Sequence, residues 1–197
     1  MTDTQTTQYY SRNASRYAVD TAKRSMAAAI DRFSALLRPG ASVVDIGCGA
    51  GRDLKAFRQR GFNVVGLDVS AELASIAAEY SGCPVVIADM REMPFASASF
   101  DAAWAAASLL HVFHGHIPAA LAEIGRVLKP GGHFFSSVKQ GEGQRREADG
   151  RLFTYFAPAE WIAVQERSGF SITESTGTGH DPETPGNQWF NSIAKRA

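Results

Sequence analysis

The sequence predicts an α/β protein with a doubly wound, mostly parallel sheet. Short apolar runs recur along the chain and alternate with segments whose apolar residues have helical spacing. Strands that are buried on both faces by helices have apolar runs of this kind. A third observation is a glycine-rich turn, Gly47–Gly51, that separates the first apolar run from a helical segment and from a second run ending at Asp68. Such a strand–turn–helix–strand unit places a ligand at the carboxyl edge of a parallel sheet.

The elements follow in order from these patterns. Strands are expected at 42–46, 64–67, 84–88, 100–104 and 133–138, and the segments 170–178 and 188–195 are expected to pair as terminal strands. Helices are expected near 50–59, 71–80, 118–128 and 158–168. Ser70 is the expected N-cap of the second of these helices. Pro118 and Pro158 suit the first turn of a helix, where a missing amide donor costs nothing.

The N-terminal segment is expected to be helical. Residues 1–8 are polar, and we expect them to be mobile. From residue 9 to residue 37 the pattern predicts a helix that is broken near residue 20, with Asp20 or Thr21 as the N-cap of its second part. Pro39 follows and ends it.

Composition limits the class of protein. The 197 residues fit one domain. Lys and Arg number 20, as do Asp and Glu, so the formal net charge is +0 and provides no bulk attraction to nucleic acid or to an anionic membrane. Two cysteines, Cys48 and Cys83, cannot form a disulfide framework, and no apolar run reaches the roughly 18 residues of a membrane span. We expect a cytoplasmic monomer or weak homodimer without nucleic-acid or membrane partners.

The glycine turn indicates a nucleoside site. Glycines at 47, 49 and 51 allow a sharp bend and a close approach of a ligand to the main chain. A carboxylate at the end of the second strand, Asp68, can accept hydrogen bonds from both ribose hydroxyls. The dinucleotide fingerprint G-x-G-x-x-G fails, because Arg52 occupies the position of its third glycine. This argues against a nicotinamide-dependent dehydrogenase.

Four segments together resemble the class I S-adenosylmethionine-dependent methyltransferases. Asp45 and the spacing G-x-G-x-G resemble motif I of that family. Residues 85–90, 95–112 and 121–138 resemble its later segments, in the expected order. The resemblance runs from about residue 37 to the C-terminus. It implies a Rossmann-like sheet of seven strands with an antiparallel last strand, in a single domain with an N-terminal lid segment (1–38) and a core (39–197).

The resemblance also implies a cofactor and its site. S-adenosylmethionine would be bound, with S-adenosylhomocysteine as product and no metal. In the family pattern Asp45 holds the glycine turn and the donor's ammonium, Asp68 binds the ribose, and Asp89 meets the adenine. The expected cofactor-binding residues are Tyr10, Arg16, Tyr17, Asp45, Gly47, Cys48, Gly49, Gly51, Asp68, Val69, Asp89, Met90, Ala105, Ala106 and His111. Cys48 is expected to pack rather than to carry out redox chemistry. For Asp101, contact with a ligand and a buried structural role are both open.

The residues that would bind or act on the methyl acceptor are less constrained by the sequence than those of the cofactor site. His111 matches a family position beside the transferring methyl group, where it would contact donor or acceptor or act as general base. The charged segment 139–151 is either a solvated loop or an acceptor-binding flap. The expected catalytic residues are His111, Lys139 and Glu142, and the expected substrate-binding residues are Arg145, Arg146, Tyr155 and Trp189. His114 and His116 lack cysteine or carboxylate partners at metal-ligand spacing, so we expect no metal.

These features predict methyl transfer to a small molecule by in-line substitution. An RNA or protein acceptor is one alternative. It is disfavoured by the neutral charge and by residues 105–108, Ala-Ala-Ala-Ser, which replace the N-P-P-F/Y tetrad of many base and amide methyltransferases. A non-catalytic protein that binds the cofactor is a second alternative, since a fold does not guarantee turnover.

Overall fold

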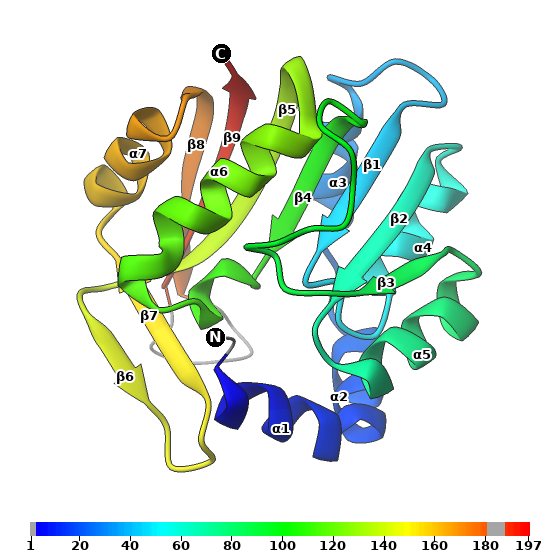
Figure 1. Cartoon of the computed structure of the whole chain (residues 1–197), viewed down its shortest axis with the longest axis vertical. Helices are drawn as coiled ribbons and strands as arrows, with labels where there is room; N and C mark the ends of the chain where they lie inside the picture. The colour runs from blue at the N-terminus through cyan, green and yellow to red at the C-terminus, as the bar shows by residue number, and fades with distance from the viewer. Residues whose placement is uncertain (1–2, 181–187) are drawn as a thin grey trace.

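A single twisted sheet organises the computed structural model, which describes residues 3–180 and 188–197 (Figure 1). Within these residues the sheet has nine strands in the order β3-β2-β1-β4-β5-β7-β6, and β9 joins β5 to β8. Pairing from β3 to β7 is parallel, while the β5–β9, β8–β9 and β6–β7 pairs are antiparallel. The strands are β1 (Ser42–Ile46), β2 (Asn63–Asp68), β3 (Val85–Ile87), β4 (Phe100–Ala106), β5 (Leu128–Gln140), β6 (Gln144–Arg146), β7 (Leu152–Phe156), β8 (Phe170–His180) and β9 (Gln188–Arg196). The Rossmann-like α/β class is confirmed, with two strands more than the expected seven.

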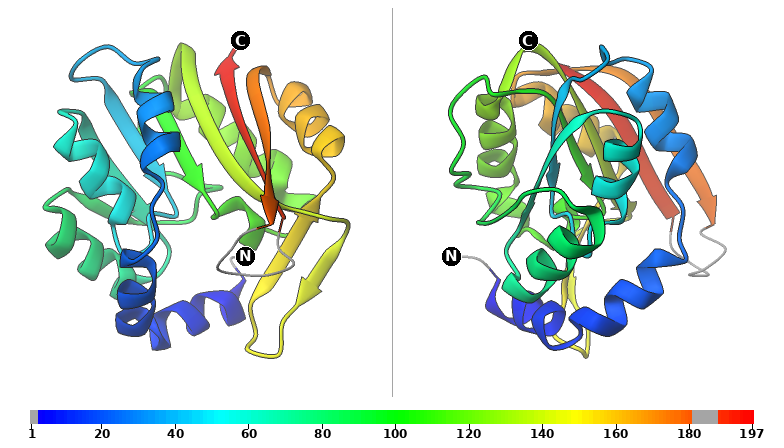
Figure 2. Two further views of the ribbon diagram at one scale, coloured as in Figure 1. Left: turned by 180° about the vertical axis from the view of Figure 1, so that it is seen from behind. Right: turned by 90° about the vertical axis from the view of Figure 1, so that its right-hand side faces the viewer.

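Helices cover both faces of the sheet. The helices are α1 (Thr4–Arg12), α2 (Ala14–Ala22), α3 (Ala27–Ser34), α4 (Arg52–Gln59), α5 (Ala71–Ser81), α6 (Ile117–Val127) and α7 (Pro158–Arg167), with short 3₁₀ turns η1 (Leu109–His111) and η2 (His114–His116). α6 and α7 lie on one face, α3 and α4 lie on the other with α5 beside α4, and α1 and α2 cross the carboxyl edge of the strands (Figure 2). None of the helices in the described ranges is long and apolar enough to cross a bilayer.

Each face of the sheet has its own apolar core. On the α6 and α7 side, Trp161 and the buried face of α6 pack against the strands. On the α3 and α4 side, Trp104 stacks on Phe135 with ring centroids 3.8 Å apart, Phe57 packs edge-on against Trp104, and Phe33 packs against it at a tilt. Burying a large apolar side chain stabilises a fold by about 1.5–3 kcal/mol, so these layers hold the strand ends in fixed positions.

The N-terminal segment differs from the expectation. The helical segment is divided into α1, α2 and α3, with breaks at Asn13 and at 23–26 rather than near residue 20; Asp20 and Thr21 lie inside α2 and cap no helix. Residues 3–8 are not a mobile tail, because Asp3 caps α1 through the N–H of Thr6 and the helix packs at the edge of the sheet. The elements around α5, α6 and α7 agree with expectation, including the Ser70 N-cap and the prolines in the first turns.

The charged segment after β5 forms a hairpin rather than a loop. β6 and β7 pair antiparallel, and β7 then runs parallel to the end of β5, with Lys139 opposite Tyr155. Leu152, Thr154 and Phe156 are buried, which anchors β7 to the body of the protein, while β6 is exposed. The hairpin extends past the carboxyl edge of the sheet and lies beside α1 (Figure 1).

Asp101 lies near the start of β4, at the edge of the sheet opposite the carboxyl ends of the strands, and its contacts there are structural. Its carboxylate accepts hydrogen bonds from the backbone N–H of Ser42 (2.9 Å), from the Ser42 hydroxyl (2.7 Å) and from Lys129 Nζ (2.8 Å). Burial alone would raise the pKa of Asp101, but the contacts with Lys129 and Ser42 outweigh it and hold the pKa well below its ordinary value. Asp101 therefore links β1, β4 and the start of β5 and does not face a ligand.

We expect Asp101→Asn to lower the free energy of unfolding by about 1–3 kcal/mol at neutral pH, since hydrogen bonds to a charged group are lost. Because the folded state lowers this pKa, the contribution is complete above the ordinary carboxyl pKa of about 3.9 and shrinks progressively as the pH falls from there toward the lower pKa of the folded state. Urea unfolding from about pH 6 to about pH 3 measures this. Asp20→Asn, at an exposed position, is the control. A difference between the two variants that does not shrink in acid would contradict the assignment.

Candidate functional site

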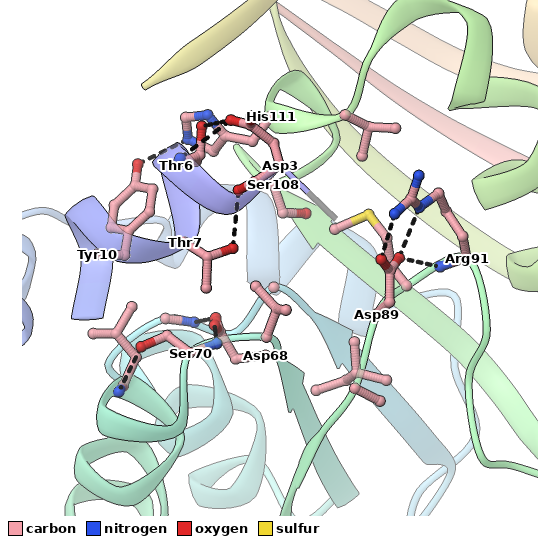
Figure 3. Close-up of a pocket in the computed structure, with 18 of the residues that line it drawn as sticks. Asp3, Thr6, Thr7, Tyr10, Asp68, Ser70, Asp89, Arg91, Ser108 and His111 are labelled. Carbon is pink, nitrogen blue, oxygen red and sulfur yellow. Dashed lines mark hydrogen bonds and ion pairs between the residues drawn. The ribbon is translucent and has the colours of Figure 1, made fainter. Parts of the chain in front are cut away.

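A cavity lies at the carboxyl edge of the sheet, under α1 (Figure 3). Its lining comes from segments far apart in the sequence: α1, the glycine turn, the ends of β2 and β3, and the segment after β4. The position is the point where β1 has β2 on one side and β4 on the other, which is where open parallel sheets bind ligands.

The glycine turn closes the base of this cavity. Gly47 and Gly49 line it, with φ of 72° and 55°, in the left-handed region that favours glycine. A Cβ on Gly47 would lie 2.4 Å from Ser108 Cβ, so the turn and the segment after β4 touch at a distance that only glycine allows. Gly51 lies outside the lining; its absent Cβ would be 2.8 Å from Ala77 Cα, so it permits α4 to pack against α5.

Asp68 joins the end of β2 to the glycine turn. One carboxylate oxygen accepts from the N–H of Gly49 at 2.8 Å, and the other accepts from the N–H of Ser70 at 2.9 Å. Burial raises the pKa of this carboxyl above its ordinary value. Asp68 lines the cavity, and a carboxylate has about four lone-pair sites, so it retains acceptor capacity toward a ligand.

Asp45 lies behind the turn rather than in the cavity lining. It is 3% exposed, and within the described residues its Oδ2 has no hydrogen-bond partner. Burial, together with the nearby carboxyl of Asp53, raises the pKa of Asp45 well above its ordinary value. Asp53 itself is held by Arg52 at 2.7 Å and by Trp104 Nε1 at 3.0 Å. A cationic group near Asp45 would favour its ionised form.

Asp89 and Met90 line the cavity beyond the end of β3. Arg91 forms a bidentate pair with Asp89, with Nε 2.9 Å from Oδ1 and Nη2 2.6 Å from Oδ2, and the Arg91 N–H also donates to Oδ1. The pair fixes the orientation of the carboxylate and uses three of its acceptor sites. Sequence reasoning missed Arg91, although an arginine two residues after an acid at a strand end is a readable signal.

Tyr10 and His111 form a pair on the roof of the cavity. The Tyr10 hydroxyl is 2.8 Å from His111 Nε2, and His111 Nδ1 is 2.7 Å from the carbonyl oxygen of Leu152. A carbonyl can only accept, so Nδ1 carries the proton and Nε2 accepts from Tyr10. Burial lowers the pKa of His111 to about 4, although the hydrogen bond to the Leu152 carbonyl raises it; the charges of Arg151 and Lys139 make smaller lowering contributions. Burial raises the pKa of Tyr10. Both groups are therefore neutral at physiological pH.

The β6–β7 hairpin holds α1 in place over the cavity. The N–H of Leu152 donates to Thr6 Oγ1 at 2.8 Å, and Arg146 forms a bidentate pair with Asp3, with N–O distances of 2.9 and 3.0 Å. Because the Leu152 carbonyl accepts from His111, both backbone groups of Leu152 are tied to the roof of the cavity. Asp3, Thr6 and Thr7 line the cavity and were missed from the sequence, where their polarity indicated a mobile tail.

Several expected cofactor residues lie elsewhere. Tyr17 and Val69 line the cavity, as expected. Arg16 is exposed and lies 3.4 Å from the Tyr9 hydroxyl, outside the lining. Ala105 and Ala106 are part of β4, and the lining is formed by the next two residues, Ala107 and Ser108. Cys48 is buried in the turn, where burial raises the pKa of its thiol, and it does not line the cavity.

The other expected acceptor-side residues lie along the hairpin, at the end of β5 and at the start of β9, and none of them is in the lining of the cavity. Lys139 lies over Phe153, and Trp189 is paired opposite it on β9. Arg145 pairs with Glu147 and contacts the Tyr155 hydroxyl at 3.2 Å. Glu142 is exposed in the turn before β6 and does not line the cavity.

His114 and His116, the two histidines that follow His111, have structural partners. His114 Nε2 lies 2.8 Å from Glu160, and His116 Nδ1 lies 2.9 Å from Arg91 Nη1. In the described part of the chain, no three His, Cys, Asp or Glu side chains are grouped so that they could hold a metal ion.

Comparison with known proteins decides the family. Residues 44–136, which contain the glycine turn, Asp68, Asp89 and His111, match the family model described as a methyltransferase domain. The chain contains a class I S-adenosylmethionine-dependent methyltransferase domain.

Curated relatives of this methyltransferase domain match about half of the chain. A malonyl-[acyl-carrier protein] O-methyltransferase of Erwinia pyrifoliae is 37% identical over 108 residues, which are 53% of this chain and 40% of that protein. A 2-phytyl-1,4-naphtoquinone methyltransferase of Synechocystis sp. is 40% identical over 104 residues, which are 47% of this chain and 42% of that protein. The match thus spans well under half the length of these relatives.

The fold is shared over nearly the whole chain with a solved methyltransferase. The Burkholderia thailandensis 1,6-didemethyltoxoflavin-N1-methyltransferase, crystallised with S-adenosylhomocysteine, has a TM-score of 0.82, is 24% identical, and covers 98% of this chain and 88% of its own. At this identity the likeness concerns the fold.

The chemistry of the methyltransferase cavity fits an S-adenosylmethionine molecule. Acids at the ends of β2 and β3 provide acceptors for hydroxyl and amino groups, and Leu67, Ala88 and Met90 provide apolar contacts for a planar base. Within the described chain, the buried oxygens Asp45 Oδ2 and Ser108 Oγ have no hydrogen-bond partner. Ser108 lines the cavity and leaves a polar group there for a ligand, while Asp45 lies behind the glycine turn.

Proposed function

We propose that the protein transfers a methyl group from S-adenosylmethionine to a small-molecule acceptor by in-line substitution. The observation that carries this proposal is the meeting of Gly47, Gly49, Asp68 and the Asp89–Met90 pair on one cavity under α1. The relatives support it, since they are named for a naphthoquinone and for malonyl-[acyl-carrier protein], and the structural neighbour was solved with 1,6-didemethyltoxoflavin.

Each group of residues would hold one part of the donor. Asp68 would accept hydrogen bonds from the ribose hydroxyls, and Asp89 and Met90 would contact the adenine. Asp45 would interact with the ammonium group, directly or through water, and that charge would lower its raised pKa. When bound, the donor supplies a methyl group on a positively charged sulfur.

The protein's own contribution is to position the two reactants and to exclude water. The inner face of α1, with Thr6, Thr7 and Tyr10, covers the cavity, and the hairpin fixes α1 through Leu152 and Arg146. Holding two reactants in line can lower a barrier by ~7–11 kcal/mol. His111 positions Tyr10 in this arrangement. A general base works best with a pKa near the working pH, so a ring with a pKa of about 4 and both nitrogens engaged supports positioning rather than proton removal.

Calorimetry with S-adenosylmethionine and S-adenosylhomocysteine tests the proposal. We expect each of the two compounds, titrated separately, to bind with a stoichiometry of one molecule per chain. The absence of binding at millimolar ligand would contradict the proposal. Turnover is then measured as S-adenosylhomocysteine formed over a broad panel of small acceptors. Tight binding without turnover on any acceptor would favour a non-catalytic binding protein, and steeply salt-dependent binding of RNA would favour an RNA acceptor.

A further inference from the structure

Ser108 carries a buried hydroxyl at the wall of the cavity (Figure 3). The residue is 6% exposed, and its Oγ has no hydrogen-bond partner in the described chain. A buried hydroxyl without a partner destabilises a folded protein, and native structures satisfy nearly all such groups. An unpartnered hydroxyl that lines a cavity therefore points to a ligand that completes it.

The backbone around Ser108 holds the hydroxyl at the glycine turn. Ala107, directly after β4, has a φ of 55°, in the left-handed region that alanine rarely adopts, and it turns the chain from the strand into η1. The Ser108 carbonyl accepts from the N–H of His111 at 3.0 Å. A Cβ on Gly47 would lie 3.2 Å from Ser108 Oγ. The hydroxyl thus lies where the glycine turn meets the segment that carries His111.

The lining residues follow the carboxyl edge of the sheet in the order of the strands. Asp89 and Met90 come after β3, Asp68 ends β2, Gly47 comes after β1 and Ser108 comes after β4, and the sheet order is β3-β2-β1-β4. In the proposed complex the adenine lies at β3 and the ribose at β2. The donor is connected in the order adenine, ribose, sulfur and amino acid, so the part beyond the sugar falls on β1 and β4. Ser108 is therefore at the amino-acid end.

The carboxylate at this end of the donor would be met by uncharged groups. Among the lining residues in the described ranges, Arg91 alone has a full positive charge, and it pairs with Asp89 at the adenine end. Arg16 was expected to reach the cofactor, but it is exposed and lies outside the lining. A hydrogen bond from a hydroxyl to a carboxylate is charge-assisted and stronger than one between neutral groups.

The hydroxyls of α1 that line the cavity already donate within the protein. Those of Thr6 and Thr7 donate to Asp3, and that of Tyr10 donates to His111. The Ser108 hydroxyl can donate to a ligand without giving up a bond of this kind.

Two further hydroxyls of the lining lie on the Asp68 side of the glycine turn. Ser70 caps α5 through its Oγ. The Tyr17 hydroxyl would lie 3.5 Å from a Cβ on Gly49, whose N–H donates to Asp68. Both are beside the proposed ribose position, which leaves Ser108 for the amino-acid end.

We infer that the Ser108 hydroxyl binds the amino-acid end of the donor by donating a hydrogen bond to its carboxylate. The inference rests on the proposed methyl transfer. Asp45, behind the glycine turn, is proposed to interact with the ammonium group of the same amino acid. The two charged groups would thus have separate partners. Because the hydroxyl has no protein partner, its contribution is to binding and not to the stability of the free protein.

Ser108→Ala and Ser34→Ala form a matched pair of variants. Ser34 Oγ is also buried without a hydrogen-bond partner in the described chain, but it belongs to α3 and lies outside the cavity. Alanine at 108 keeps the Cβ that faces Gly47 and removes only the hydroxyl. Since an unpartnered hydroxyl is removed in each case, we expect neither variant to unfold at a lower urea concentration than the wild-type protein. Earlier unfolding of Ser108→Ala would show that its hydroxyl has a partner in the free protein, which overturns the inference.

Calorimetry with three ligands then isolates the carboxylate. The ligands are S-adenosylhomocysteine, its decarboxylated analogue, and methylthioadenosine, which lacks the whole amino-acid end. We expect Ser108→Ala to weaken binding of S-adenosylhomocysteine at least about tenfold, and to change binding of the other two ligands less than about twofold. Ser34→Ala is expected to leave all three affinities unchanged.

The pattern over the three ligands separates the outcomes. If Ser108→Ala binds S-adenosylhomocysteine as tightly as Ser34→Ala does, the hydroxyl does not contact the donor. Equal weakening of S-adenosylhomocysteine and the decarboxylated analogue would show that the carboxylate is not the partner, and equal weakening of all three would show a general disturbance of the cavity. Each of these results overturns the inference and leaves the proposed function intact. Absence of S-adenosylhomocysteine binding by the wild-type protein would instead refute the proposed function, and this inference with it.

Discussion

Gly47→Ala is expected to weaken S-adenosylhomocysteine binding at least about tenfold more than Gly40→Ala does. The two glycines have nearly the same backbone conformation, with φ of 72° and 73°, so an alanine at either position bears a similar left-handed strain of roughly 1–2 kcal/mol. They differ in their surroundings. The new methyl at 40 meets nothing within 4 Å, whereas at 47 it would lie 2.4 Å from Ser108 Cβ and push the turn away from the segment that carries His111.

Calorimetry measures the affinities, and urea unfolding measures the stabilities. Overpacking costs about 1–3 kcal/mol beyond the conformational strain, so Gly47→Ala is also the less stable of the two. The double variant Gly47→Ala/Ser108→Gly removes the obstructing Cβ, and measured against Ser108→Gly alone it is expected to show little of the difference, which keeps the test informative if Gly47→Ala folds poorly. Equal affinities in Gly47→Ala and Gly40→Ala would show that the contact with Ser108 does not matter to the donor site.

Asp68→Asn is expected to weaken S-adenosylhomocysteine binding by about 100-fold, or about 3 kcal/mol. The carboxylate accepts from two backbone N–H groups on opposite sides, Gly49 and Ser70, and in the proposed complex from ribose as well. An amide has one acceptor oxygen, and its NH₂ group would face an N–H donor or a ligand hydroxyl. The loss combines a displaced glycine turn with a missing partner for the sugar.

Glu79→Gln removes a carboxylate from the exposed side of α5 and is the control. Thermal unfolding establishes that each variant is folded before its affinity is measured. If Asp68→Asn is folded and binds S-adenosylhomocysteine as tightly as Glu79→Gln, Asp68 is not part of the donor site.

The sequence was most informative where one local pattern decides the structure. Alternating apolar runs and helical segments correctly predicted the α/β class, because strand and helix patterns differ in period. The Ser70 cap was predicted from residue type, and the antiparallel last strand was implied by the resemblance to the methyltransferase family. The glycine spacing and the acids at the strand ends predicted Gly47, Gly49, Asp68 and Asp89, which the fold brings to one cavity because parallel strands all end at the same edge, whereas Asp45 and Gly51 lie outside its lining.

Contacts between distant segments could not be predicted in this way. α1 is ordered by Leu152 and Arg146, more than 140 residues further along the chain, so its polar residues indicated a mobile tail. Asp53 of α4 illustrates both cases, because its partner Arg52 is adjacent in the sequence, whereas its partner Trp104 lies on β4, 51 residues further along the chain. β6 has an entirely exposed and polar sequence, and only its pairing with β7 makes it a strand.

The contact between the hairpin and the N-terminal helix depends on main-chain atoms at Leu152. Thr6 accepts from its amide and His111 donates to its carbonyl, so neither bond depends on which side chain is present. Another apolar residue at this position would preserve both bonds, while proline, which has no amide hydrogen, would remove the bond to Thr6. Related proteins with different side chains at this position could therefore keep both main-chain hydrogen bonds, and a comparison of their sequences would not show them.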